Sequence, residues 1–153
     1  MNPRHSLRLV PFVAVLSLSG CLQDSASYVF PEKDHAITLV RNQTLFWLDT
    51  VDVEVIAVRL PECNDGIRVE DVPRAGKLAL YRAPDAYPEP IFILHTDQRL
   101  YAISTQSCRV QKFKEAPADL GEKLGQFYEK DGKFQFVAGG AADANPAPGA
   151  KGE

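Results

Sequence analysis

Two short, partly apolar segments near the C-terminal end of the chain are joined by the dipeptide Asp131-Gly132. Asp-Gly is favoured in the type I′ turn, because both central residues need a positive φ and the turn twists as paired antiparallel strands do. We therefore predict a β-hairpin formed by residues 126–130 and 133–137. Phe134 and Phe136 are two positions apart, so they share one face of the second strand and indicate a sheet with a buried side.

Most of the remaining pattern is also typical of strands. Residues 51–55 alternate strictly between valine and an acidic residue, as in a strand with one buried face. Pro61 ends this apolar segment, and Asn64-Asp65-Gly66 is typical of a turn. Further strands are predicted at 35–41, 51–60, 77–82, 91–95 and 100–104. Within the same strand-rich pattern, residues 44–48 form a short aromatic run, residues 67–70 suit a brief strand, and residues 108–113 suit a strand or a turn.

The expected fold class is mainly β. A helix is indicated only over residues 117–124, where Pro117 stands at a position that suits the first turn. The chain is therefore predicted to fold as a small antiparallel sandwich or partly open barrel of seven to nine strands, with at most one short helix.

The N-terminal segment has the organisation of an export signal. Basic residues within the first eight positions precede an apolar stretch over residues 9–18, which is too short to span a bilayer. The stretch ends in Leu18-Ser19-Gly20-Cys21, which resembles the lipobox of bacterial lipoproteins. This resemblance implies cleavage before Cys21, with a diacylglyceryl thioether and an N-acyl group on that cysteine. The alternative is an ordinary secretory signal with an incidental cysteine.

The resemblance also implies a location. A single acyl chain binds membranes only marginally, so several chains on Cys21 are needed for stable anchoring. Leu22, rather than an aspartate, follows Cys21. By the sorting pattern of enterobacterial lipoproteins, this residue favours the outer membrane. The expected location is the cell envelope, where lipid holds the chain on the outer membrane facing the periplasm.

Four regions are predicted along the chain: a signal peptide (1–20), a lipidated tether (21–27), a single β-rich domain (28–138) and a disordered tail (139–153). The tail is assigned because it has no large apolar residue to offset its ordering entropy by burial. After removal of the signal, 15 basic and 20 acidic residues remain, a formal net charge of −5. The sequence has no cluster of basic residues that could neutralise the phosphates of a nucleic acid, so nucleic acid is not an expected partner.

Cys63 and Cys108 remain once Cys21 is assigned to the lipid. Two such cysteines in an exported chain are most simply explained by one disulfide. The alternative is a metal site that adds His35 or His95, but neither C-x-x-C nor H-x-x-x-H zinc spacing is present. We expect a disulfide, with no metal and no cofactor.

Two places could form a binding surface. Trp47 is more typical of a core or a half-buried sheet, but an exposed Trp47 would be the strongest anchor in the chain. The second place is the proline-rich segment 83–90, which excludes regular helix or a central strand. It carries Tyr87 between prolines, together with Asp85 and Glu89, and its stiffness would reduce the entropy lost on binding.

Carboxylates beside an aromatic residue suggest one possible chemistry. Asp49, Asp52 and Glu54 follow Trp47 closely, and paired carboxylates hydrolyse glycosides in many enzymes. However, Asp52 and Glu54 alternate with valines, so their simplest interpretation is the solvated face of a strand.

The histidines suggest a second possible chemistry. His35 and His95 could each serve a Ser–His–acid arrangement with a hydroxyl from Ser104, Thr105 or Ser107. No G-x-S-x-G nucleophile motif is present, and strand-edge roles explain both histidines. No catalytic residue is therefore assigned.

These observations favour a non-enzymatic accessory or binding module of the envelope, anchored by lipid and contacting an unidentified protein or polymer. Two alternatives stay open. One is a periplasmic inhibitor or immunity protein that blocks a hydrolase or toxin through an acidic, rigid loop. The other is a small cell-wall hydrolase, which would need two acidic residues to converge in a cleft.

Overall fold

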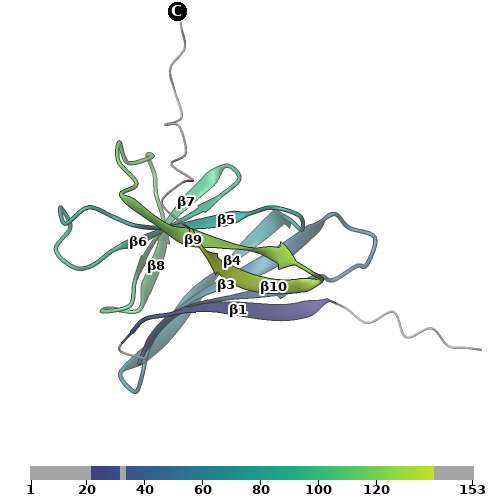
Figure 1. The fold of residues 1–153 in the computed structure, drawn as a ribbon, viewed down its shortest axis with the longest axis horizontal. Coiled ribbons are helices and arrows are strands. Elements are labelled where there is room, and N and C mark those ends of the chain that lie inside the picture. Colours follow the sequence, from purple (N-terminus) through teal and green to yellow (C-terminus); the bar gives the residue numbers. More distant parts are fainter. Residues whose placement is uncertain (1–21, 32–33, 140–153) are drawn as a thin grey trace, which may run out of the picture.

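A computed structural model describes residues 22–31 and 34–139 of the chain. Within these residues ten strands form, and all paired neighbours are antiparallel. In chain order the strands are β1 (Gln23–Val29), β2 (His35–Asn42), β3 (Thr50–Arg59), β4 (Cys63–Pro73), β5 (Leu78–Arg82), β6 (Phe92–Thr96), β7 (Arg99–Ser104), β8 (Arg109–Lys112), β9 (Glu122–Lys130) and β10 (Lys133–Ala138). They form a four-stranded sheet in the order β1-β2-β3-β4 and a six-stranded sheet in the order β10-β9-β5-β6-β7-β8 (Figure 1).

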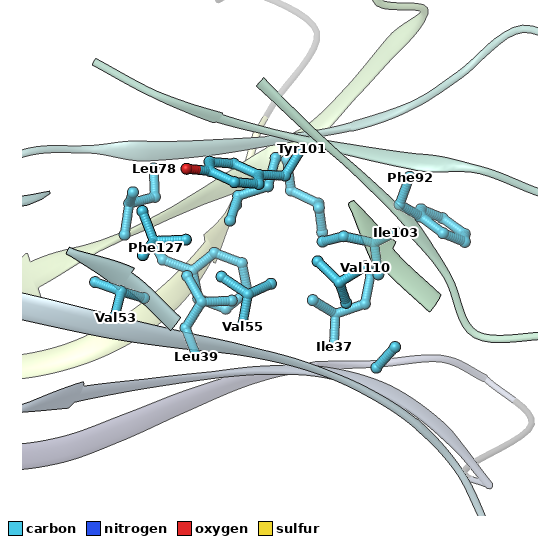
Figure 2. Close-up of a cluster of buried hydrophobic side chains, with 14 of the residues drawn as sticks. Ile37, Leu39, Val53, Val55, Leu78, Phe92, Tyr101, Ile103, Val110 and Phe127 are labelled. Carbon is cyan, nitrogen blue, oxygen red and sulfur yellow. The ribbon is translucent and has the colours of Figure 1, made fainter. Parts of the chain in front are cut away.

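The two sheets pack face to face over an apolar core (Figure 2). The valines that alternate with acidic residues in β3 point into it, and Val53 and Val55 are fully buried. The facing sheet contributes Leu78, Ile103 and Phe127. Each such side chain stabilises the fold by about 1.5–3 kcal/mol relative to its exposed state, so burial of these faces holds the sheets together.

The sheets remain separate at their edges. β1 contacts β10 and β4 contacts β8, but in the part of the chain that the structure describes no backbone ladder joins one sheet to the other. The fold is an open antiparallel β sandwich rather than a closed barrel, which confirms the predicted mainly β class. The described strands number ten, so the expected range of seven to nine was too low.

The predicted C-terminal hairpin is confirmed. Lys130 pairs with Lys133 across the turn, and Asp131 and Gly132 have φ values of 53° and 73°, as a type I′ turn requires. Phe134 and Phe136 both belong to the core side of β10.

A buried arginine joins three strands at one end of the sandwich. Arg41 of β2 is 2 % exposed and forms a two-point ion pair with Asp24 of β1. Its Nη2 also donates to Glu129 of β9 at 3.2 Å, and its guanidinium lies 4.1 Å from the ring centroid of Phe134. Burial lowers the pKa of Arg41, but the hydrogen bonds and charges of Asp24 and Glu129 outweigh this effect and raise it.

Two of the predicted local structures are corrected. Residues 117–121 are not helical, and Glu122 already begins β9, because pairing with β5 takes precedence over a weak helix signal. The expected turn at Asn64-Asp65-Gly66 lies inside β4, which runs unbroken from Cys63. β3 approaches β4 closely at Gly66. A Cβ at this position would lie 2.4 Å from the Val55 carbonyl oxygen, so glycine is required there.

The folded domain also begins earlier in the chain than expected. Residues 23–27 belong to β1, which pairs along its whole length with β2. Polar side chains suit this edge strand: Asp24 binds Arg41, and the Ser27 and Thr38 hydroxyls lie 2.8 Å apart. The domain therefore includes residues that composition alone had assigned to the tether. The signal peptide, Cys21 and residues 140–153 of the predicted tail lie outside the described residues.

Candidate functional site

A cleft of about 670 Å³ opens at one end of the sandwich. Its walls come from five segments that are distant in sequence: the end of β1, the start of β2, the end of β3, the loop between β5 and β6, and the turn between β7 and β8. Phe30 and Phe92 contribute apolar surface, and their rings are 4.8 Å apart in an edge-to-face arrangement. The site exists only because strand pairing brings these segments together.

The proline-rich loop predicted as a binding segment forms one wall of the cleft. Asp85, Tyr87 and Glu89 all line it. The loop is irregular, as expected, and is closed at its base by a hydrogen bond from the Ala83 amide to the Ile91 carbonyl at 3.0 Å. Tyr87 is partly buried against a small apolar cluster that includes Ala83.

A hydrogen bond connects this loop to the opposite wall. The Ser107 hydroxyl donates to Glu89 Oε1 at 2.9 Å, so the loop is tied to the turn between β7 and β8. Ser104 stabilises the same turn, since its Oγ accepts from the amides of Gln106 and Ser107. The wall is therefore ordered by the chain itself, which favours binding with little loss of conformational entropy.

The cleft carries charges of both signs. Arg59 and Arg82 line it together with Asp85 and Glu89. Arg59 is only loosely compensated: its Nη1 donates to the Gln106 carbonyl at 3.4 Å, and its Nε lies 4.0 Å from the nearest Glu62 oxygen. A partner that fits this site would present charges of both signs around an apolar centre.

The sequence contained little sign of the basic residues in this cleft. Arg82 directly precedes the proline-rich segment, and this adjacency was an available signal. No sequence signal indicated that Arg59 would line the cleft, because its position depends on where β3 ends relative to β2. His35 was noted in the sequence for acid–base chemistry rather than for a binding cleft.

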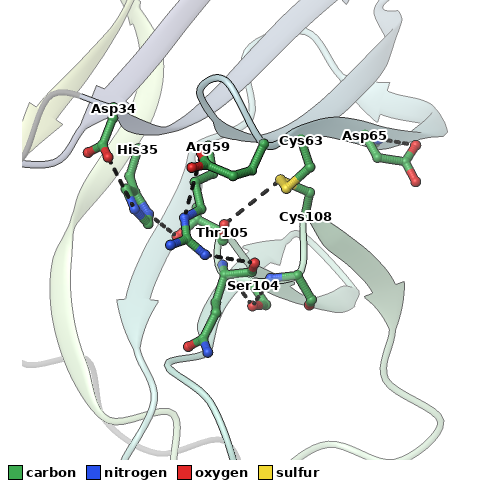
Figure 3. The surroundings of a disulfide bond; sticks show 12 residues. Asp34, His35, Arg59, Cys63, Asp65, Ser104, Thr105 and Cys108 are labelled. Atoms are coloured by element: carbon green, nitrogen blue, oxygen red, sulfur yellow. Dashed lines mark hydrogen bonds and ion pairs between the residues drawn. A yellow bond between two sulfur atoms is a disulfide. The ribbon is translucent and has the colours of Figure 1, made fainter.

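His35 lines the cleft, and its ring lies between a hydroxyl and a carboxylate (Figure 3). Its Nδ1 is 3.0 Å from Thr105 Oγ1, and its Nε2 is 3.9 Å from Asp34 Oδ2. The second distance exceeds that of a hydrogen bond, and the Asp34 side chain is half exposed. Asp34 therefore does not orient the imidazole as the acid of a catalytic triad does, and the Thr105 contact ties β2 to the opposite sheet.

The other hydroxyls and the second histidine do not join this group. Ser104 bonds to backbone amides and Ser107 bonds to Glu89. His95 lies in β6, and it does not line the cleft. Within residues 22–31 and 34–139, the structure thus brings one histidine and one hydroxyl together without the rest of a triad.

The predicted disulfide between Cys63 and Cys108 is present (Figure 3). The Cα atoms are 5.9 Å apart, and the bond joins the first residue of β4 to the turn that contributes Thr105 to the cleft. It therefore links the two sheets next to the site. In the chain-entropy description, a bridge between residues 45 positions apart contributes about 4 kcal/mol to stability.

Trp47 lies elsewhere, and two expectations about it were wrong. Residues 44–48 form bends and a turn rather than a strand, and Trp47 is 62 % exposed rather than buried. β2 begins at His35 beside the cleft and ends at Asn42, shortly before this turn, so the two places lie at opposite ends of the strand. Trp47 and Tyr87 therefore cannot form one continuous surface.

The three acidic residues near Trp47 are also separated. Asp49 lines a second hollow of about 640 Å³, together with Arg74, Lys77 and Glu129. Asp52 and Glu54 do not line it; they lie on the outer face of β3, as their alternation with valines predicted. In the described residues, no three His, Cys, Asp or Glu side chains are grouped to hold a metal ion, and no helix has the length and apolar character to cross a membrane.

Fold and site together define a disulfide-linked antiparallel β sandwich with a proline-rimmed cleft at one end. Comparison of the chain with known protein families, with curated proteins and with solved structures gave no match.

Proposed function

We propose that this protein is a lipid-anchored, exported binding module that uses the cleft to hold a protein partner in the cell envelope. The observation that carries the proposal is the position of the cleft relative to the chain end that leads to Cys21. β1 begins at Gln23, beside Asn42 at the end of β2, whereas the cleft lies at the start of β2.

The eight residues of β2 separate these two ends by about 25 Å, since a strand rises about 3.3 Å per residue. A lipid at Cys21 would thus hold one end of the sandwich at a membrane while the cleft stayed accessible at the other. The lipobox resemblance supports the anchor, and the ordered loop around Tyr87 supports recognition.

The character of the cleft favours a protein over a uniformly charged polymer. It combines the guanidinium groups of Arg59 and Arg82 with the carboxylates of Asp85 and Glu89. Paired charges around aromatic residues are typical of protein–protein recognition, where complementary potentials give specificity.

Photocrosslinking in cells tests this proposal. A photoreactive residue at Tyr87 is compared with one at Gln98, which lies in the exposed turn between β6 and β7 outside the cleft. We expect one dominant protein adduct at position 87. The same protein should not be captured at position 98. Equal capture at both positions, or no adduct at position 87, would contradict a role for the cleft.

Charge reversal provides a matched control. Arg82→Glu changes the cleft, whereas Arg68→Glu makes the same change at an exposed position of β4 outside it. Capture from position 87 should fall with the first variant and persist with the second. If the captured partner is a hydrolase or a toxin, the function is that of an inhibitor or immunity protein acting through the same loop.

A further inference from the structure

Four consecutive apolar residues are exposed in the turn between β2 and β3. The apolar turn, as we call residues 45–48, contains Leu45, Phe46, Trp47 and Leu48, and its two aromatic side chains are 65 % and 62 % exposed. Large apolar side chains are rarely exposed side by side without a binding role.

The turn is held in one shape. The Leu48 amide donates to the Leu45 carbonyl at 3.1 Å, and the buried amide side chain of Gln43 donates to the Leu48 carbonyl. The rings of Phe46 and Trp47 contact each other edge to face at 4.7 Å. The apolar side chains are therefore presented as an ordered surface.

The apolar turn lies where the chain enters the domain. The backbone amide of Gln43 donates to the backbone carbonyl of Leu22 at 2.9 Å. Leu22 directly follows Cys21 in the sequence. Figure 1 shows the start of β1 and the connection between β2 and β3 at the same end of the sandwich. A lipid on Cys21 would therefore bring this end of the domain against a bilayer.

The surroundings of the turn favour a lipid surface over a second copy of the chain. The exposed area of only four side chains falls well short of the roughly 800 Å² that each partner of a stable interface buries. The adjoining hollow carries Arg74 and Lys77 against Asp49 and Glu129, so its charges are balanced. Tryptophan is the residue best suited to the membrane interface, because its ring is apolar and its N–H is polar.

We propose that the apolar turn inserts into the interfacial layer of the membrane that holds Cys21, and so sets the domain with its cleft facing away from the bilayer. This inference rests on the proposed lipid anchor. Insertion supplies a second membrane contact beside the acyl chains and fixes the orientation of the domain. Since the nearby charges balance, it does not depend on anionic lipid.

Trp47 reports on its own environment, because it is the single tryptophan of the chain. The protein is isolated from the membranes of producing cells and reconstituted into phosphatidylcholine vesicles, with and without brominated acyl chains. We expect blue-shifted Trp47 emission, strong quenching by the bromine atoms and loss of quenching by iodide in the water.

A relocated tryptophan is the matched control. The double variant Trp47→Phe, Leu60→Trp carries its reporter beside the cleft, at a position whose side chain is 59 % exposed, close to the exposure of Trp47. Its emission should stay quenchable by iodide and insensitive to brominated lipid. Both positions are exposed, so the variant should keep the melting temperature of the native protein.

The outcomes separate this inference from the anchor. Mass analysis that finds no acyl group on Cys21 would overturn both proposals. An acylated protein in which Trp47 behaves like the reporter at position 60 would overturn only membrane insertion. Blue-shifted Trp47 emission without bromine quenching would also overturn it, because the turn would then be covered by protein rather than lipid.

Discussion

Arg41 and Asp24 face each other on neighbouring strands, with Nε 2.8 Å from Oδ1 and Nη2 2.6 Å from Oδ2. This two-point geometry matches the guanidinium fork to the carboxylate. The same arginine reaches Glu129 in the other sheet, so one buried cation connects β1, β2 and β9. It does so at the end of the domain where the chain leads back to Cys21.

Replacing Arg41 by an uncharged residue should destabilise the fold. Arg41→Met leaves the carboxylates of Asp24 and Glu129 without their shared partner, and we expect a loss of about 2–3 kcal/mol in the free energy of unfolding. This loss is smaller than the roughly 3–5 kcal/mol that follows when a fully buried ion pair is broken, because both carboxylates are partly exposed to water. Urea unfolding measures the change. Arg68→Met on the exposed side of β4 should change stability by less than about 0.5 kcal/mol, and a similar loss in both variants would disprove the role of Arg41.

The disulfide should carry a large share of the stability of the domain. Cys63→Ser, or reduction of the native protein, should lower the melting temperature by about 10 °C or more, because the unfolded chain gains the entropy that the bridge removes. Calorimetry of the oxidised protein, the reduced protein and the double variant Cys63→Ser, Cys108→Ser checks this. A shift below about 2 °C would show that the bridge is dispensable.

Two glycines should respond differently to alanine. At Gly125, a Cβ would lie 2.3 Å from the Val137 carbonyl oxygen and 2.9 Å from the Ala138 Cα, so Gly125→Ala should cost about 3 kcal/mol. At Gly132 no atom of the described residues lies within 4 Å of the added Cβ, but φ is 73°, so Gly132→Ala should cost only about 1 kcal/mol. Denaturant unfolding of both variants tests the order, and a larger loss at Gly132 would contradict the β9–β10 geometry.

The proposed anchor makes a prediction in cells. Cys21→Ser removes the acceptor of the lipid, so the protein should move from the membrane fraction to the soluble periplasmic fraction. The apolar turn alone should not retain it, since one weak membrane contact gives only reversible binding. Fractionation and immunodetection measure the distribution, with Arg68→Met at an exposed position of β4 as a control that keeps Cys21 and the disulfide. Retention of Cys21→Ser in the membrane would point to a different anchor.

Local sequence patterns were enough to predict much of the secondary structure. The Asp131-Gly132 turn, the buried valines of β3 and the irregular proline-rich loop are all as predicted, because each depends on backbone preferences or on alternation within a few residues. The same local reasoning failed for residues 23–27 and 64–66. Their strand structure depends on pairing partners that local composition does not specify.

The candidate site was only half predictable. Asp85, Tyr87 and Glu89 were identified because prolines mark their loop as stiff and exposed. Arg59 and His35 reach the same cleft because β2 and β3 pair in one particular register, with His35 opposite Arg59. That register is set by core burial over the whole sandwich, so neither residue could be assigned to a cleft from its neighbours in sequence.

By itself, the sequence determined a mainly β chain and marked the loop around Tyr87 as stiff, since strand alternation and proline geometry act within a few residues. The pairing of Cys63 with Cys108 followed from the number of cysteines that remain once Cys21 is assigned to the lipid. Only the tertiary structure decided that Trp47 is exposed, that its turn adjoins Leu22, and that the cleft lies at the other end of β2. An aromatic residue is equally compatible with a core and with a binding surface. Its burial depends on which strands cover it, and that is settled by packing between segments far apart in the chain.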